Sequence, residues 1–109
     1  MSPPRFSLAH VTPYPWESQD NEINAHVARL AGEQSKRGHR VLILAPSRSP
    51  ERVRESRREV RAAKSRPESL LDGTNSGTPR VVAIGEVLDV ARTLEELLGR
   101  TPLDFVHVH

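Results

Sequence analysis

The stretch Val41-Leu42-Ile43-Leu44-Ala45 decides the fold of this chain. A continuous apolar run of this length favours a strand covered on both faces, as the strands of parallel sheets are. Three more runs are spaced for strands, at residues 6–11, 81–84 and 105–108. The sequence therefore predicts four short strands with connections long enough to hold helices.

The periodicity of apolar residues predicts a helix after the first strand and another before the last. Asp20 or Asn21 can cap the first helix, and Gly38 supplies its stop signal. Gly99 ends the second helix. The apolar face of the first helix is predicted to be Ile23, Val27, Leu30 and Ala31, and that of the second Val87, Ala91, Leu94 and Leu98.

Alternating strands and helices indicate an α/β fold, a Rossmann-like doubly wound parallel sheet formed by residues 1–109 as one domain. Cysteine is absent and 36% of the residues are hydrophobic, so neither a disulfide framework nor thiolate chemistry is expected. No apolar run has the length of a membrane span, and no signal peptide is recognisable. We therefore expect a cytoplasmic protein.

The segment 47–79 differs in composition from the rest and is interpreted as a basic insert, flexible or helical. Its part 48–66 holds eight Arg or Lys residues against Glu51, Glu55 and Glu59. Arg54, Arg58 and Arg61 follow helical spacing, whereas residues 72–79 are typical of a flexible loop. Few apolar residues interrupt the charges, so a largely exposed helix is predicted here.

Candidate ligand-binding residues gather after the first strand. Tyr14 and Trp16 are the only residues of their types, and each ring combines an apolar body with a polar group. They suit a ligand-facing loop, although they could equally cover the edge of the sheet. The helix that follows offers free backbone N–H groups at its amino end. No glycine-rich dinucleotide or P-loop motif is present.

Histidines mark the last strand. His107 and His109 alternate onto one face, about 7 Å apart. Because no third ligand of suitable spacing is visible, no metal site is predicted. His107 is interpreted as a core histidine, and His10 and His39 receive no functional role. His109 lies at the carboxyl end of its strand, where a general base or a contact to a sugar hydroxyl would be useful.

Four motifs occur in an order that resembles the amino-terminal domain of family 4 retaining glycosyltransferases of the GT-B fold, particularly the phosphatidylinositol mannosyltransferase type. They are Val11-Thr12-Pro13-Tyr14, Ile23-Asn24-Ala25-His26-Val27, Gly38-His39-Arg40-Val41 with Ala45-Pro46, and Asp104-Phe105-Val106-His107-Val108-His109. The resemblance implies the acceptor-binding part of an enzyme that moves a sugar from a nucleotide-sugar donor to a hydroxyl acceptor with retention.

By motif, Tyr14 and Asn24 match acceptor-binding positions and His109 matches a catalytic histidine of the cleft. The acceptor would be a lipid or a small molecule, and no metal or other cofactor is implied. The family usually has a Gly-Gly pair before the first helix, where this chain has Gln19-Asp20-Asn21-Glu22. The family's carboxyl-terminal donor domain has no counterpart in the 109 residues, so the chain is expected to be a truncated domain, inactive by itself.

A different function remains open for the arginine-rich segment 48–66. A non-catalytic α/β binding module could use it to contact nucleic acid or another anionic surface. The lack of interleaved aromatic residues removes base stacking, so nucleic acid is the less favoured partner. For the same segment, a peripheral contact with the inner face of an anionic membrane and a solvated helix without a partner both stay open.

Overall fold

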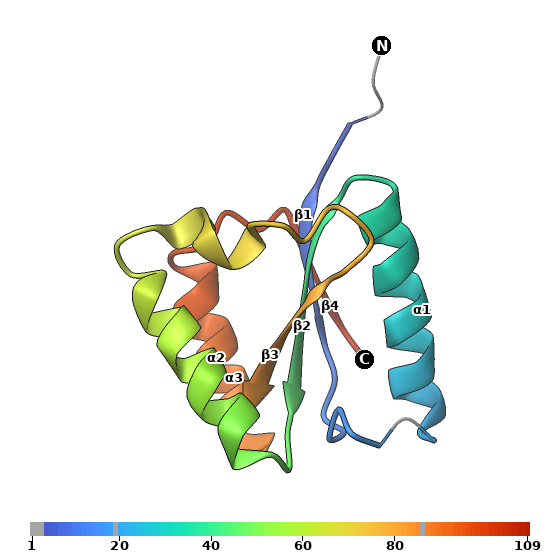
Figure 1. Cartoon of the computed structure of the whole chain (residues 1–109), viewed down its shortest axis with the longest axis vertical. Helices are drawn as coiled ribbons and strands as arrows, with labels where there is room; N and C mark the ends of the chain where they lie inside the picture. Colours follow the sequence, from blue (N-terminus) through green and yellow to red (C-terminus); the bar gives the residue numbers. More distant parts are fainter. Residues whose placement is uncertain (1–3, 19, 86) are drawn as a thin grey trace.

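The computed structural model describes residues 4–18, 20–85 and 87–109, and its centre is one parallel sheet (Figure 1). The strands are β1 (Ser7–Val11), β2 (Arg40–Pro46), β3 (Arg80–Ile84) and β4 (Phe105–Val108). They lie in the order β3-β2-β1-β4. The four predicted strands are therefore confirmed, with boundaries shifted by one residue at most.

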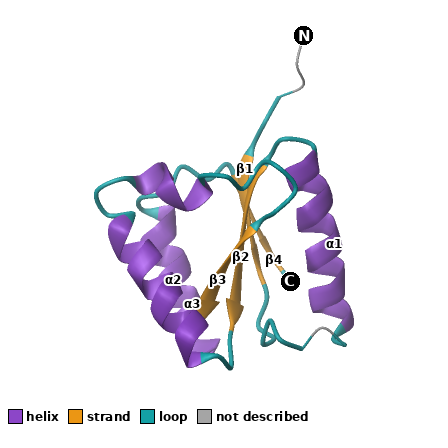
Figure 2. Cartoon of the chain, in the orientation of Figure 1, coloured by secondary structure: helices purple, strands orange, loops and turns teal. Residues whose placement is uncertain are grey.

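Helices cover both faces of this sheet (Figure 2). Helix α1 (Glu22–Lys36) joins β1 to β2 and lies on one face. Helix α2 (Pro50–Ala62), the 3-10 helix η1 (Pro67–Leu71) and helix α3 (Val87–Leu98) lie on the other. The chain thus has the predicted doubly wound α/β architecture. No described helix is long and apolar enough to cross a membrane.

Strand β2 supplies both cores because its side chains alternate between the two faces. Leu42 and Leu44 pack among α2, η1 and α3, whereas Val41 and Ile43 pack beneath α1. All four are 0–2% exposed. The uninterrupted apolar run at residues 41–45 reflects this double burial.

Helix α1 begins and ends as the sequence predicts. The Asn21 side chain accepts hydrogen bonds from the backbone N–H of Ile23 (2.9 Å) and of Asn24 (3.2 Å), which caps the amino end. Gly38 has a φ of 94° just after the helix, a conformation that glycine adopts without steric cost. Of the predicted apolar face, Val27 and Ala31 are fully buried, whereas Ile23 is exposed.

The predicted apolar face of α3 is wrong in part. Val90 and Leu97 are buried, Leu94 packs against the same core, and Ala91 is exposed. Val90, Leu94 and Leu97 are spaced i, i+4, i+7, so they form a second stripe that the sequence pattern could not distinguish from the first. The side chains of Val87 and Leu98, the other predicted members, lie outside the described residues.

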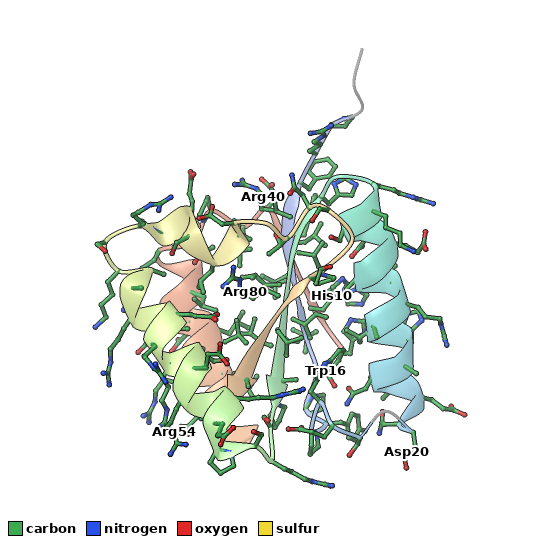
Figure 3. All side chains as sticks on the ribbon, viewed as in Figure 1. His10, Trp16, Asp20, Arg40, Arg54 and Arg80 are labelled. Atoms are coloured by element: carbon green, nitrogen blue, oxygen red, sulfur yellow. The ribbon has the colours of Figure 1, made fainter. Side chains whose placement is uncertain are left out.

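The segment 47–79 forms the connection that two neighbouring parallel strands require. Ser56 of α2 accepts the backbone N–H of Ala83 (2.8 Å), and Glu59 pairs with Arg80 (3.0 Å), so α2 is fixed to edge strand β3 (Figure 3).

The steps from β1 to β2 and from β2 to β3 run the same way across the sheet, yet α1 and α2 cover opposite faces. The two crossovers therefore have opposite hands.

The loop at residues 72–79, predicted to be flexible, is held by a buried threonine. The Thr74 hydroxyl donates to the carbonyl of Leu71 (2.8 Å) and accepts the N–H of Val41 (3.1 Å), and the Thr74 carbonyl accepts from Ser35 Oγ (2.5 Å). The loop thus joins η1, β2 and α1. Leu70 and Leu71, just before it, are 1% exposed and supply apolar contacts that the charge pattern of the segment hides.

Candidate functional site

The carboxyl ends of β1 and β4 bring the candidate site residues to one edge of the sheet. The N–H of His109 donates to the carbonyl of Val11 (2.8 Å), which places His109 beside the end of β1. The ring of His109 lies 6.1 Å from that of His26, in the second turn of α1. The edge is therefore lined by the end of β4, the loop after β1 and the amino-terminal part of α1.

His10 is the central side chain of this edge and is only 1% exposed. Its Nε2 lies 2.7 Å from Gln34 Oε1, between the sheet and α1 (Figure 3). An amide oxygen only accepts, so Nε2 carries the hydrogen and Nδ1 of the neutral ring presents its lone pair. His109 Nε2 lies 3.0 Å from that Nδ1 and donates to it. The sequence interpretation, which gave His10 no role, missed this contact.

His107 stands beside these two rings rather than in the core. Its ring stacks on His109 with centroids 4.0 Å apart and lies 5.5 Å from the ring of His10. The side chain is exposed, so the interpretation of His107 as a core histidine is wrong. The reason is that β4 is the outer strand of the sheet, and α1 packs chiefly over β2.

Burial is the main cause that disfavours the charged forms of His10 and His109. Burial lowers the pKa of His10 and outweighs the opposing hydrogen bond to Gln34. Burial, followed by the neighbouring His107 and His10, lowers the pKa of His109 to about 4. His109 is therefore neutral near pH 7. It can donate or accept a hydrogen bond but is a weaker base than a general base working near pH 7 should be.

Asn24 holds the loop that follows β1. It is 0% exposed, and its amide donates to the carbonyls of Pro15 (2.8 Å) and Tyr14 (3.3 Å). Its Oδ1 accepts from the hydroxyl of Thr12 (2.7 Å). Both ends of the side chain are thus occupied within the protein. Thr12, also fully buried, is a member of this arrangement that the sequence interpretation did not single out.

Tyr14 is 39% exposed at the surface of this loop. The loop is also tied to the end of β2, because Glu17 accepts hydrogen bonds from Ser47 Oγ and from the N–H of Arg48 (3.1 Å). Trp16 packs against the core beneath α1. Of the two aromatic residues, Trp16 therefore covers the sheet, and Tyr14 is the one available to a ligand.

The amino end of α1 is poorly suited to a phosphate group. Asn21 already accepts the N–H groups of Ile23 and Asn24. Its sequence neighbours Asp20 (Figure 3) and Glu22 are both exposed. Negative side chains complement the helix dipole but repel a second anion. Gln19, the remaining residue of the unusual loop sequence, lies outside the described residues.

A scan against protein-family models and searches of curated proteins and of solved structures found no match to this chain.

Proposed function

We propose that this chain is the acceptor-binding part of a GT-B glycosyltransferase, which moves a sugar from a nucleotide-sugar donor to a lipid or small-molecule hydroxyl acceptor with retention. The supporting observation is the meeting of the His109 strand end with the anchored Tyr14 loop at the carboxyl edge of the sheet. Ligands of open α/β sheets bind at this edge. The order of the sequence motifs supports the same assignment.

The roles follow from the surroundings of each residue. Tyr14 offers an exposed ring to the acceptor, and sugars and lipid head groups both pack well against such rings. Asn24 acts through the position of that loop, since its own polar atoms are already paired. His109 acts as a neutral hydrogen-bonding group toward the reacting sugar and its acceptor.

The donor nucleotide would be bound mainly by a second, carboxyl-terminal domain. The capped and acid-flanked amino end of α1 supports this division, because the N–H groups of Ile23 and Asn24 at that end of the helix are already paired and are not free for a diphosphate. No metal or organic cofactor is needed for this acceptor role. The 109 residues alone are therefore expected to be inactive.

A transfer assay tests the proposal. Release of nucleotide from a panel of uridine- and guanosine-diphosphate sugars would be followed with phosphoinositide and with simple glycosides as acceptors. The 109-residue chain should release none, whereas the chain extended along its own reading frame with a donor-binding domain should release nucleotide in an acceptor-dependent manner. Absence of a donor-binding domain in that reading frame, or acceptor-independent hydrolysis only, would contradict the proposal.

We further propose that α2 places the cytoplasmic protein against the inner face of an anionic membrane, where a lipid acceptor would lie. The inner side of α2 is fixed by Val53 and Ser56, which are buried. Its arginines are exposed, and Arg54 points away from the sheet (Figure 3). Each Arg near an anionic surface contributes ~1 kcal/mol. The exposed arginines are Arg52, Arg54, Arg57, Arg58 and Arg61.

Co-sedimentation with phosphatidylserine vesicles should show binding at low salt that disappears at about 0.5 M salt, where screening is nearly complete. Replacing four exposed α2 arginines by Gln should abolish this binding. A control with the same loss of charge elsewhere should keep most of it. The test set is Arg54, Arg57, Arg58 and Arg61, and the control set is Arg5, Arg29, Lys36 and Arg37. If the wild-type protein does not bind the vesicles but does bind duplex DNA, the nucleic-acid alternative is favoured.

A further inference from the structure

Three imidazole rings, one from β1 and two from β4 and its end, converge on one point beside α1. One ring nitrogen from each of His10, His107 and His109 lies within 4.8 Å of the other two. We propose that these residues form a three-nitrogen binding site for a divalent transition-metal ion such as Zn²⁺. The site shares His109 with the proposed transferase function but goes beyond it, and metal binding can be tested without transfer because all three ligands belong to this chain.

The spacing of the nitrogens is close to that of a metal site. Zinc–nitrogen bonds of about 2.0–2.1 Å in a tetrahedron place two ligand atoms about 3.4 Å apart. His10 Nδ1 and His109 Nε2 are 3.0 Å apart, and no pair exceeds 4.8 Å. Small rotations of the two β4 rings would bring the three nitrogens around one ion, which would replace the proton shared by His10 and His109.

Gln34 prepares His10 for this role. Metal-binding histidines almost always donate their second ring N–H to an acceptor, which fixes the tautomer and the ring orientation. Gln34 Oε1, 2.7 Å from His10 Nε2, is such an acceptor. It leaves the Nδ1 lone pair directed at His109. The hydrogen bond to Gln34 therefore leaves His10 with an unprotonated Nδ1 that is already oriented to bind a metal ion.

The chemistry of the three rings selects the kind of ion. Imidazole nitrogens suit Zn²⁺, Cu²⁺ and Ni²⁺, whereas Mg²⁺ and Ca²⁺ require oxygen ligands. The ligands must be unprotonated, and the lowered pKa values of His10 and His109 favour that form. His26 is the next nearest ring, with its centroid 6.1 Å from that of His109, so it stands outside the ligand set.

Solvent reaches the site through a groove between α1 and β4. The groove has a volume of about 400 Å³ and includes His10, Gln34 and His107 in its walls. Three protein ligands leave a fourth tetrahedral position for water or another small ligand. Because β4 exposes His107 to this groove, an ion could enter without unfolding the sheet.

Calorimetric titration of the 109-residue chain with zinc chloride at pH 7.5 tests the site. We expect one zinc ion to bind per chain. At a free zinc concentration a hundredfold above Kd, the midpoint of thermal unfolding should rise by an amount on the order of 10 °C. His107→Gln and His109→Gln should each weaken binding by at least tenfold, and the double variant should lose it. Gln34→Leu should weaken it by about tenfold through the orientation of His10.

His39→Gln is the matched control, since His39 lies at the opposite end of β1, where its Nδ1 accepts the N–H of Phe6 (3.0 Å). This variant should bind zinc like the wild type. Magnesium chloride should give no heat. Cobalt chloride should give the visible absorption bands of a tetrahedral nitrogen site. Equal zinc affinity in the wild type and the His107→Gln/His109→Gln variant, or no zinc binding at all, would overturn the proposal.

Discussion

Replacing His109 with alanine in the proposed two-domain transferase is expected to slow sugar transfer by about a hundredfold. The backbone N–H of His109 donates to the carbonyl of Val11, which fixes His109 at the carboxyl edge of the sheet. Loss of one preorganised hydrogen-bonding group toward the transition state typically costs 10²–10³ in rate, or about 3 kcal/mol. Donor affinity should change less than about twofold, because the proposed function assigns donor binding mainly to the other domain.

The conservative His109→Gln variant should recover part of the lost rate, since its amide can still donate and accept. His39→Ala, at the opposite end of β1, should transfer at the wild-type rate. With the pKa of His109 near 4, its protonation state is constant from pH 6 to 8, so His109 itself should contribute no inflection to the rate in that range. Transfer rates and calorimetric donor titrations check these points. A wild-type rate in His109→Ala would remove His109 from the mechanism.

Replacing Asn24 with leucine is expected to lower the free energy of unfolding by about 3 kcal/mol. Leucine is close to asparagine in size but removes the Asn24 partner of the Thr12 hydroxyl and of the Tyr14 carbonyl, next to a side chain that is 0% exposed. The Pro15 carbonyl loses one of two hydrogen bonds, because it also accepts the N–H of Ser18 (3.0 Å). Buried polar groups left unpaired cost more than the net value of the hydrogen bonds themselves. Urea denaturation followed by circular dichroism measures the change.

The exposed Asn75 provides the control, because Asn75→Leu should change stability by less than about 0.5 kcal/mol. Thr12→Val tests the pairing directly. Once Thr12 has lost its hydroxyl, Asn24→Leu should cost less than it does in the wild type, since the two side chains share one hydrogen bond (2.7 Å). Additive effects of the two substitutions would show that Asn24 stabilises the chain in another way.

The sequence was most informative where burial affects a continuous stretch. Residues 41–45 face both cores, so every position is apolar and the strand is visible without a partner. The ends of α1 could also be predicted from the sequence, because they depend on local interactions. Asn21 accepts a backbone N–H two residues away, and Gly38 adopts a positive φ just after the helix. Local chemistry therefore sufficed for the number, type and approximate limits of the strands and of α1.

Where two local patterns competed, the sequence was a poor guide. Helix α3 offers two apolar stripes, and only the position of the helix over the sheet selects Val90, Leu94 and Leu97. The structural role of the charged segment 47–79 could not be predicted from its sequence. Its Ser56 and Thr74 side chains accept hydrogen bonds from backbone N–H groups of β3 and β2, which are distant in sequence. A polar residue that pairs with a remote N–H gives no periodic signal.

The site shows the same division between sequence and tertiary structure. The His-x-His alternation placed His107 and His109 on one face of a predicted strand, and strand polarity placed His109 at its end. His10 lies 99 residues from His109, and Gln34 is on another element, so nothing in the local sequence joins them. His10 and His107 lie opposite each other only because β1 pairs with β4 in this register. The chain thus carried its strands and a histidine pair in its sequence, whereas the three-ring cluster exists because the sheet brings its first and last strands together.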